Sequence, residues 1–175
     1  MLRARKHLKG FEKLRQELQG RYAPLTVYDD DEVKLFSSDP VAWITYEWPN
    51  HPILSSIGQD PDRQQFVRLW PRDDWQRVAI VGAKDTAKSV YFAVMALWSM
   101  IFWSYQVGHS VRCGIMAGSE EQAKIDLKYM TAKSDRGIAH RGTKTRFVIE
   151  KDTENGIRLK NGAESWVYAA SYYRA

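Results

Sequence analysis

The stretch that decides the fold is Val78-Ala79-Ile80-Val81-Gly82-Ala83-Lys84-Asp85-Thr86-Ala87-Lys88-Ser89. Its first four residues are apolar and mostly β-branched, and the run is too short for a helix, which predicts a buried strand. A polar loop follows at once, and an apolar helix is expected from about residue 88 to residue 106. The stretch therefore predicts a strand, a loop and a helix in direct succession.

The loop matches a phosphate-binding pattern: glycine, four residues, a second glycine, lysine, and then serine or threonine. Every required position matches except Ala87, which stands where the second glycine is usual. Backbone N–H groups of such a loop converge on phosphate oxygens at the positive end of the following helix. The residues expected to bind nucleotide are Gly82, Ala83, Lys84, Asp85, Thr86, Ala87, Lys88 and Ser89.

Two side chains of the loop have distinct expected roles. Lys88 should reach the β- and γ-phosphates of ATP, and the hydroxyl of Ser89 should bind Mg²⁺, so ATP and Mg²⁺ are the predicted cofactors. Alanine at position 87 costs about 1 kcal/mol if the backbone there needs a positive φ, and it is harmless if the residue is helical. The sequence leaves both possibilities open.

After the loop, strands alternate with helices. Residues 111–117 form a second expected strand, and Ser119-Glu-Glu-Gln122 is a capping box that opens a helix to about Met130. A basic loop covers residues 133–146. Further strands are expected at 147–150, 157–159 and 165–170, the first two joined through Asn155-Gly156. The predicted fold class is α/β, a P-loop NTPase of RecA/ASCE type with a mostly parallel sheet flanked by helices.

The residues before the loop predict an arm followed by short helices. Residues 2–19 form an amphipathic basic helix, and residues 21–36 are expected to be a linker because of Pro24 and an acidic run. Ser38-Asp39-Pro40 starts a helix, and another begins near Asp62 and carries Gln64 and Gln65. The expected division is a helical arm and linker at 1–38 and a P-loop domain at 39–175.

The composition limits the function classes. The chain has 175 residues, of which 44% are hydrophobic, so wholesale disorder is excluded. The single cysteine, Cys113, excludes an internal disulfide framework and is expected to be a core thiol. The start resembles no signal peptide, and the most apolar run, 90–103, is short for a membrane span, so a cytoplasmic protein without a membrane is expected. The net charge of +5 suits a phosphate-rich partner.

Together these segments resemble the ATPase domain of the large terminase subunit, the DNA-packaging motor of tailed phages and related viruses. The resemblance runs from about Asp39 to the end, through 39–43, Gln64-Gln65, the phosphate loop, 119–123 and 161–170. It implies that Gln64 or Gln65 reads the adenine edge. It also implies that a ring of like subunits uses ATP hydrolysis to move double-stranded DNA into a capsid, in the host cytoplasm, with the portal protein and the small terminase subunit as partners.

The resemblance assigns further roles to basic residues. Many terminases have an arginine in the middle of the loop, where this chain has Lys84. An Arg-Gly pair, which acts on the nucleotide of the neighbouring subunit, is expected where this chain has Arg174-Ala175. Arg136, Arg141 and Arg146 are rival candidates for that role. The expected catalytic residues are therefore Lys88, Lys84 and Arg174.

The sequence departs from the terminase family in one respect, and it leaves two alternative functions open. No apolar run ending in Asp-Glu follows the loop, so the Walker B carboxylates are missing, as is the nuclease domain. We therefore expect a truncated or fragmentary product that hydrolyses little ATP. The chain could instead be a basic nucleic-acid-binding α/β module with a degenerate loop, or another P-loop NTPase of helicase-like or kinase-like type. Asp126 and Glu120 are expected on a solvated helix surface.

Overall fold

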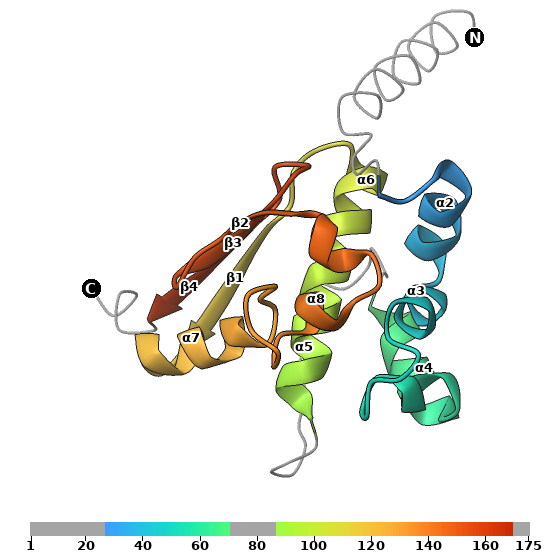
Figure 1. The fold of residues 1–175 in the computed structure, drawn as a ribbon, viewed down its shortest axis with the longest axis horizontal. Helices are drawn as coiled ribbons and strands as arrows, with labels where there is room; N and C mark the ends of the chain where they lie inside the picture. Colours follow the sequence, from blue (N-terminus) through green and yellow to red (C-terminus); the bar gives the residue numbers. More distant parts are fainter. Residues whose placement is uncertain (1–26, 71–86, 170–175) are drawn as a thin grey trace, which may run out of the picture.

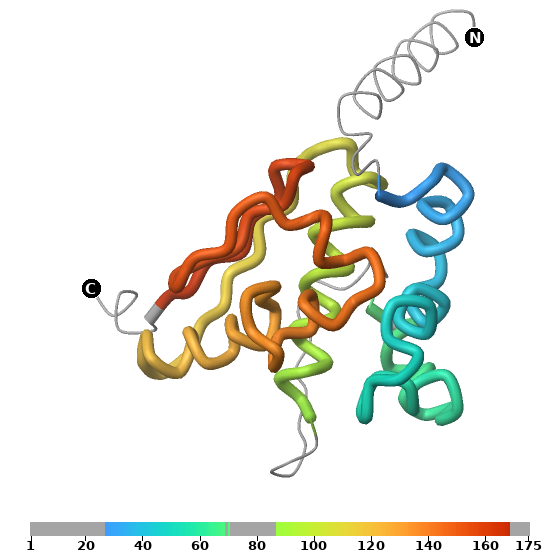
Figure 2. Tube along the Cα trace, viewed as in Figure 1, coloured from blue at the N-terminus to red at the C-terminus, as the bar shows by residue number. Residues whose placement is uncertain are grey.

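The computed structural model describes residues 27–70 and 87–169 (Figures 1 and 2). Its helices are α2 (Asp30–Ser38), α3 (Pro40–Glu47), η1 (Ser55–Gly58), α4 (Pro61–Leu69), α5 (Lys88–Trp98), η2 (Ser99–Trp103), α6 (Ser104–Val107), α7 (Glu120–Lys128), α8 (Ile138–Arg141) and η3 (Thr145–Phe147). Its strands are β1 (Arg112–Ala117), β2 (Ile149–Asp152), β3 (Gly156–Leu159) and β4 (Glu164–Ala169).

A single helix, Lys88–Val107, runs through the middle of the molecule and is built from α5, η2 and α6. It confirms the helix expected at 88–106. By length and apolar composition it could cross a bilayer, and 61% of its most apolar window is buried by the rest of the chain. Figure 1 shows helices α2 to α4 on one side of it and the sheet on the other.

The middle of this helix widens into a π turn at Ser99–Trp103. The Asn161 side chain donates a hydrogen bond to the carbonyl of Met100 at 2.8 Å. A π turn disrupts the usual backbone ladder, and such a carbonyl needs a partner when it is buried. Asn161 supplies that partner from the turn before β4.

The sheet has the strand order β1-β4-β3-β2. Strands β1 and β4 are parallel, whereas β3 pairs antiparallel with both β4 and β2. The described strands are therefore mostly antiparallel, where the sequence favoured parallel pairing. The reason is local: the turns from β2 to β3 and from β3 to β4 are too short for a crossover, so each forms a hairpin. The hairpin at Asn155-Gly156 is confirmed.

The strand expected at 78–81 and the helix expected at 2–19 lie outside the described residues. A P-loop arrangement of the whole sheet therefore stays a prediction. Within the described residues, the helix starts at Asp39-Pro40 and Ser119 are confirmed, since both side chains accept hydrogen bonds from the first turn of the following helix. The helix expected near Asp62 is α4, capped by Asp60.

The linker prediction for residues 21–36 is wrong from Asp30 onward, because α2 begins there. The Asp29 side chain accepts from the backbone N–H of Glu32 at 2.8 Å, and the Glu32 carboxylate accepts from the N–H of Asp29 at 3.0 Å. This is a reciprocal capping box. The acidic run lies in the first turn, where negative charge interacts favourably with the helix dipole. Val33 and Phe36 then reach the core.

A buried polar cluster joins α3 to the segment before β2. The Glu47 carboxylate is 0% exposed and accepts hydrogen bonds from the Tyr28 hydroxyl at 2.8 Å and from the N–H groups of Lys144 at 2.8 Å and Thr145 at 3.0 Å. The Trp43 indole donates to the Tyr28 hydroxyl at 3.1 Å. Burial, together with the nearby Glu47 charge, raises the pKa of Tyr28, which therefore stays a neutral donor.

We expect Tyr28→Phe to lower the free energy of unfolding by about 1.5–3 kcal/mol, because a hydrogen bond to a buried carboxylate is lost. Denaturant unfolding monitored by tryptophan fluorescence measures the change. Tyr168→Phe is the matched control, since that residue is 42% exposed, and it should stay within about 0.5 kcal/mol of the parent. Equal stabilities for the two variants would contradict this account of the cluster.

Candidate nucleotide-binding site

Ala87 has a left-handed backbone, with φ 57° and ψ 23°, directly before α5. It is the only non-glycine residue with positive φ in the part of the chain that the structure describes. Of the two possibilities that the sequence left open, the structure therefore has the strained one. A left-handed residue ahead of a helix helps successive N–H groups to face one concavity, which is the geometry of an anion-binding turn.

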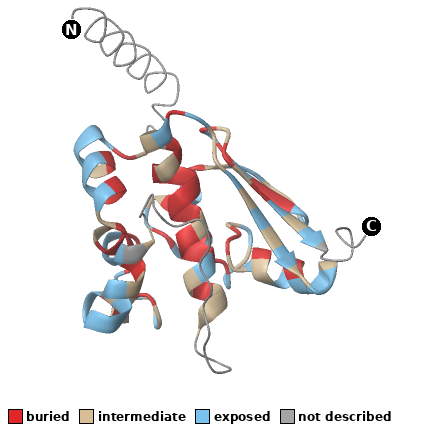
Figure 3. Cartoon of the chain, turned by 180° about the vertical axis from the view of Figure 1, so that it is seen from behind, coloured by how far each residue is buried: buried red, intermediate tan, exposed pale blue. Residues whose placement is uncertain are grey.

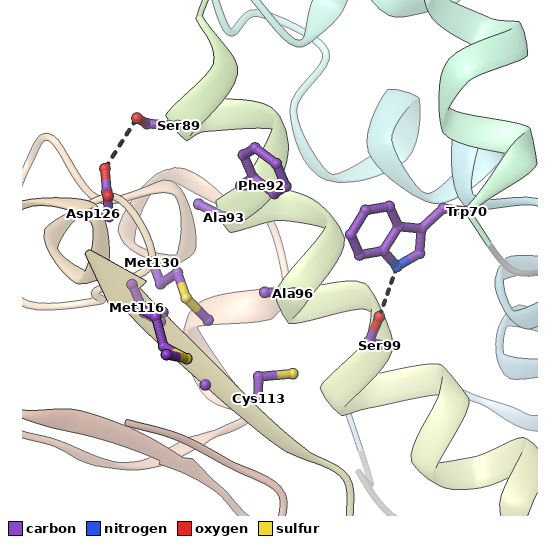
Figure 4. A pocket seen from close by; sticks show the side chains of 12 residues that line it. Trp70, Ser89, Phe92, Ala93, Ala96, Ser99, Cys113, Met116, Asp126 and Met130 are labelled. Atoms are coloured by element: carbon purple, nitrogen blue, oxygen red, sulfur yellow. Dashed lines mark hydrogen bonds between the residues drawn. The ribbon is translucent and has the colours of Figure 1, made fainter. Parts of the chain in front are cut away.

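Ser89, in the first turn of α5, donates a hydrogen bond from Oγ to Oδ1 of Asp126 at 3.0 Å (Figure 4). Asp126 lies on α7 and is half-buried. The expectation that Asp126 is a solvated surface residue is therefore wrong. A signal was present in the sequence: Ala123 and Leu127 are the buried face of α7, and Asp126 lies at the edge of that face.

A pocket of about 470 Å³ opens beside this pair, between α5, β1 and the end of α7. Figure 4 shows Ser89 and Asp126 at one end and Trp70 and Ser99 at another, where the Trp70 indole donates to Ser99 Oγ at 2.9 Å. The walls are largely apolar. The lining residues are Trp70, Ser89, Phe92, Ala93, Ala96, Ser99, Cys113, Gly114, Ile115, Met116, Asp126 and Met130.

The structure brings some of the predicted site residues together and not others. Ala87, Lys88 and Ser89 lie together at the start of α5, where Ser89 contacts Asp126. The structure does not describe Gly82, Ala83, Lys84, Asp85, Thr86 and Arg174. Helix α4 lies close to α5, because the rings of Phe66 and Tyr91 are in edge contact at 6.1 Å.

On α4, the Gln64 side chain donates to the carbonyl of Gly58 at 2.9 Å, and Gln65 is exposed. Neither glutamine lines the pocket, so the adenine-reading role stays a prediction. Arg136, Arg141 and Arg146 are all exposed within residues 133–146. Among residues 27–70 and 87–169, no group of three or more His, Cys, Asp or Glu side chains could hold a metal ion by itself.

Comparisons with known proteins give no family for this chain. No family model matches it, and neither a curated protein nor a solved structure was found that is similar to it. The functional argument therefore depends on the residues at the start of α5 and on the surfaces around them.

Cys113 projects from β1 into the pocket wall, and burial raises the pKa of its thiol to about 11. A free cysteine has a pKa of about 8.5, so at pH 8 roughly a quarter of it is thiolate. For Cys113 the thiolate fraction at that pH is about 0.1%. The thiol is therefore unsuited to nucleophilic chemistry at neutral pH.

We expect Cys113 of the native chain to react with iodoacetamide at pH 8 at least about 100-fold more slowly than Cys113 of the unfolded chain. The rate of the native chain should keep rising up to pH 11. Mass spectrometry of quenched samples measures both rates. A native rate that levels off near pH 8.5 would mean that the thiol is not buried as described.

Ala87→Gly should raise the free energy of unfolding by up to about 1 kcal/mol, because glycine adopts a left-handed backbone without a steric cost. The matched control is Ala96→Gly in the interior of α5, which should lower it by about 0.5–1 kcal/mol. Denaturant midpoints measure both. Destabilisation of the same size at both positions would show that Ala87 carries no backbone strain.

Proposed function

We propose that this chain binds ATP with Mg²⁺ at the start of α5 and is part of a DNA-packaging motor of the terminase type. The observation that carries the proposal is a hydrogen bond at the start of the central helix. Ser89, in the first turn just after the left-handed Ala87, donates from its hydroxyl to the Asp126 carboxylate on α7. The phosphate-loop pattern of residues 82–89 supports the proposal from the sequence.

The start of α5 favours a polyphosphate for three reasons. The first N–H groups of a helix have no partners within it, and the helix dipole places partial positive charge there. Lys88 adds an ammonium at the same point. Ser89 and Asp126 offer a hydroxyl and a carboxylate oxygen, which are the ligand types that Mg²⁺ prefers.

In P-loop enzymes the loop Ser or Thr and a strand carboxylate hold the magnesium ion together. This chain has no Asp-Glu pair after the loop, and Asp126 offers a carboxylate next to Ser89 from a helix instead. Mg²⁺ bound there would neutralise phosphate charge. The role proposed for Asp126 is to hold the ion, so the proposal concerns nucleotide binding in the first place.

The surface proposed to contact duplex DNA is the basic segment at residues 133–146. Its cationic side chains Lys133, Arg136, Arg141 and Arg146 are exposed, and such groups contact phosphates without reading sequence. This segment also favours the second candidate function, a nucleic-acid-binding module that does not use ATP. Nucleotide binding decides between the two.

We expect isothermal titration of the full chain with a slowly hydrolysed ATP analogue and Mg²⁺ to give saturable binding. Lys88→Ala should weaken it at least about tenfold, because the ammonium that neutralises the phosphates is lost. Asp126→Asn should weaken it only when Mg²⁺ is present, because its proposed role is to hold the ion. Glu120→Gln on the same helix is the matched control and should leave affinity unchanged.

Two results would sink the ATP proposal: absence of binding by the parent chain, or equal weakening by Asp126→Asn with and without Mg²⁺. DNA binding that falls steeply with salt in a chain that does not bind ATP would favour the second candidate.

A further inference from the structure

The outer face of the sheet carries two exposed aromatic side chains, Trp166 at 37% and Tyr168 at 42% exposure, both on β4. The other face of β4 packs on α7, and Ser165 on that face contacts the sulfur of Met130, just after the helix. Successive side chains of a strand point to opposite faces, so Trp166 and Tyr168 point away from the helices. Exposed and buried stretches alternate along these strands in Figure 3.

Each ring lies against a glycine of a neighbouring strand. A Cβ built on Gly156 of β3 would come within 2.7 Å of Cε3 and 2.9 Å of Cδ2 of Trp166. A Cβ built on Gly114 of β1 would come within 3.5 Å of Cε2 of Tyr168. The two glycines therefore let the rings settle on the backbone, one toward β3 and one toward β1, with their remaining surface in solvent.

Charged groups on this face hold Trp166 in place and leave cations exposed. The Trp166 indole donates to Oε2 of Glu164 at 3.2 Å. The same carboxylate pairs with Arg158 at 3.4 Å and with Arg112 at 4.0 Å, so its charge is compensated. The Arg112 and Arg158 side chains are 84% and 51% exposed and lie on either side of β4. Arg158 also pairs with Glu150 at 3.6 Å.

We propose that this face binds single-stranded nucleic acid, with bases stacked on Trp166 and Tyr168 and phosphates contacted by Arg112 and Arg158. The two rings are two residues apart on one strand, about 7 Å along it, so they can take neighbouring bases of an extended strand. Aromatic stacking accepts any base, because every base has a π face, so little sequence preference is expected.

Other occupants fit this face less well. The bases of a duplex are stacked inside it and cannot reach the rings. A stable contact with a second copy of the chain has few charged residues at its centre, whereas Arg112, Arg158, Glu150 and Glu164 surround the rings here. The guanidinium groups of Arg112 and Arg158 are more than half exposed, and their surface pairs with Glu164 and Glu150 are weak enough to be exchanged for the phosphates of a nucleic-acid strand.

The test is fluorescence anisotropy of a labelled twelve-residue oligothymidine, with a twelve-base-pair duplex as the second probe. Trp166→Leu and Tyr168→Leu should each weaken oligothymidine binding by about 5- to 100-fold, because leucine keeps apolar area but has no π face. Tyr46→Leu is the matched control: Tyr46 is 40% exposed on α3, across the central helix from the sheet, and its replacement should have no effect. Arg158→Gln should reduce the dependence of binding on salt.

Circular dichroism must first show that each variant is folded. The proposal is overturned if the parent chain fails to bind oligothymidine, or if Trp166→Leu binds it as the parent does. It is also overturned if sedimentation shows a dimer that Trp166→Leu dissociates, because the face would then join copies of the chain. Trp166→Leu should leave the affinity for the ATP analogue unchanged, because Trp166 does not line the pocket beside Ser89, so failure of ATP binding and failure of this proposal are distinguishable.

Discussion

Burial of the helix Lys88–Val107 is the constraint on which the rest of the structure depends. Trp98, Met95 and Leu97 are fully buried, so neighbours are required on several sides, and the sequence supplies them as helices α2 to α4 on one side and the sheet on the other. A hydrogen bond also ties the helix to its neighbours on one side, since the Trp98 indole donates to the carbonyl of Phe36 at 2.8 Å. Because the helix is fixed along its length, its first turn, with Ala87 and Ser89, is held in place relative to α7.

The strained residue lies where function is proposed, which is a common pattern. Backbone strain persists only where surrounding contacts over-determine it, and such residues cluster at binding sites. Here two backbone N–H groups, of Val90 and Tyr91, donate to the carbonyl of Ala87 and hold it at the helix start. A substitution that relieves the strain at position 87 would stabilise the chain. Stability and nucleotide affinity measured on the same variants therefore show whether the strained backbone serves binding.

Much of the fold was accessible from the sequence, because the periodicity is strong where elements are long. The central helix, β1, the Asn155-Gly156 hairpin and the caps at Asp39 and Ser119 follow from local rules that tertiary packing does not override here. The acidic run at Asp29–Glu32 indicates a loop when its charge alone is considered, although the same spacing is a capping box. The prediction of a mostly parallel sheet is wrong for the described strands, because the length of the turns, and not the apolar pattern, decides how these strands pair. The Ser89–Asp126 pair joins residues 37 positions apart, and no local pattern reveals such a contact.

The π turn at Ser99–Trp103 has a consequence for how this chain can change over evolutionary time. A π turn contains roughly one residue more than an α turn, and one residue corresponds to about 100° of rotation. Residues on the two sides of the turn make separate contacts. Before it, α5 carries Ser89. After it, the Ser104 hydroxyl of α6 accepts from the N–H of Val111 at 3.0 Å, and Gln106 donates to the carbonyl of Ser37 at 2.6 Å. Deleting one residue within the turn would leave an ordinary α turn and keep both sets of contacts facing their partners, so single-residue length changes should be tolerated better there than elsewhere in this helix.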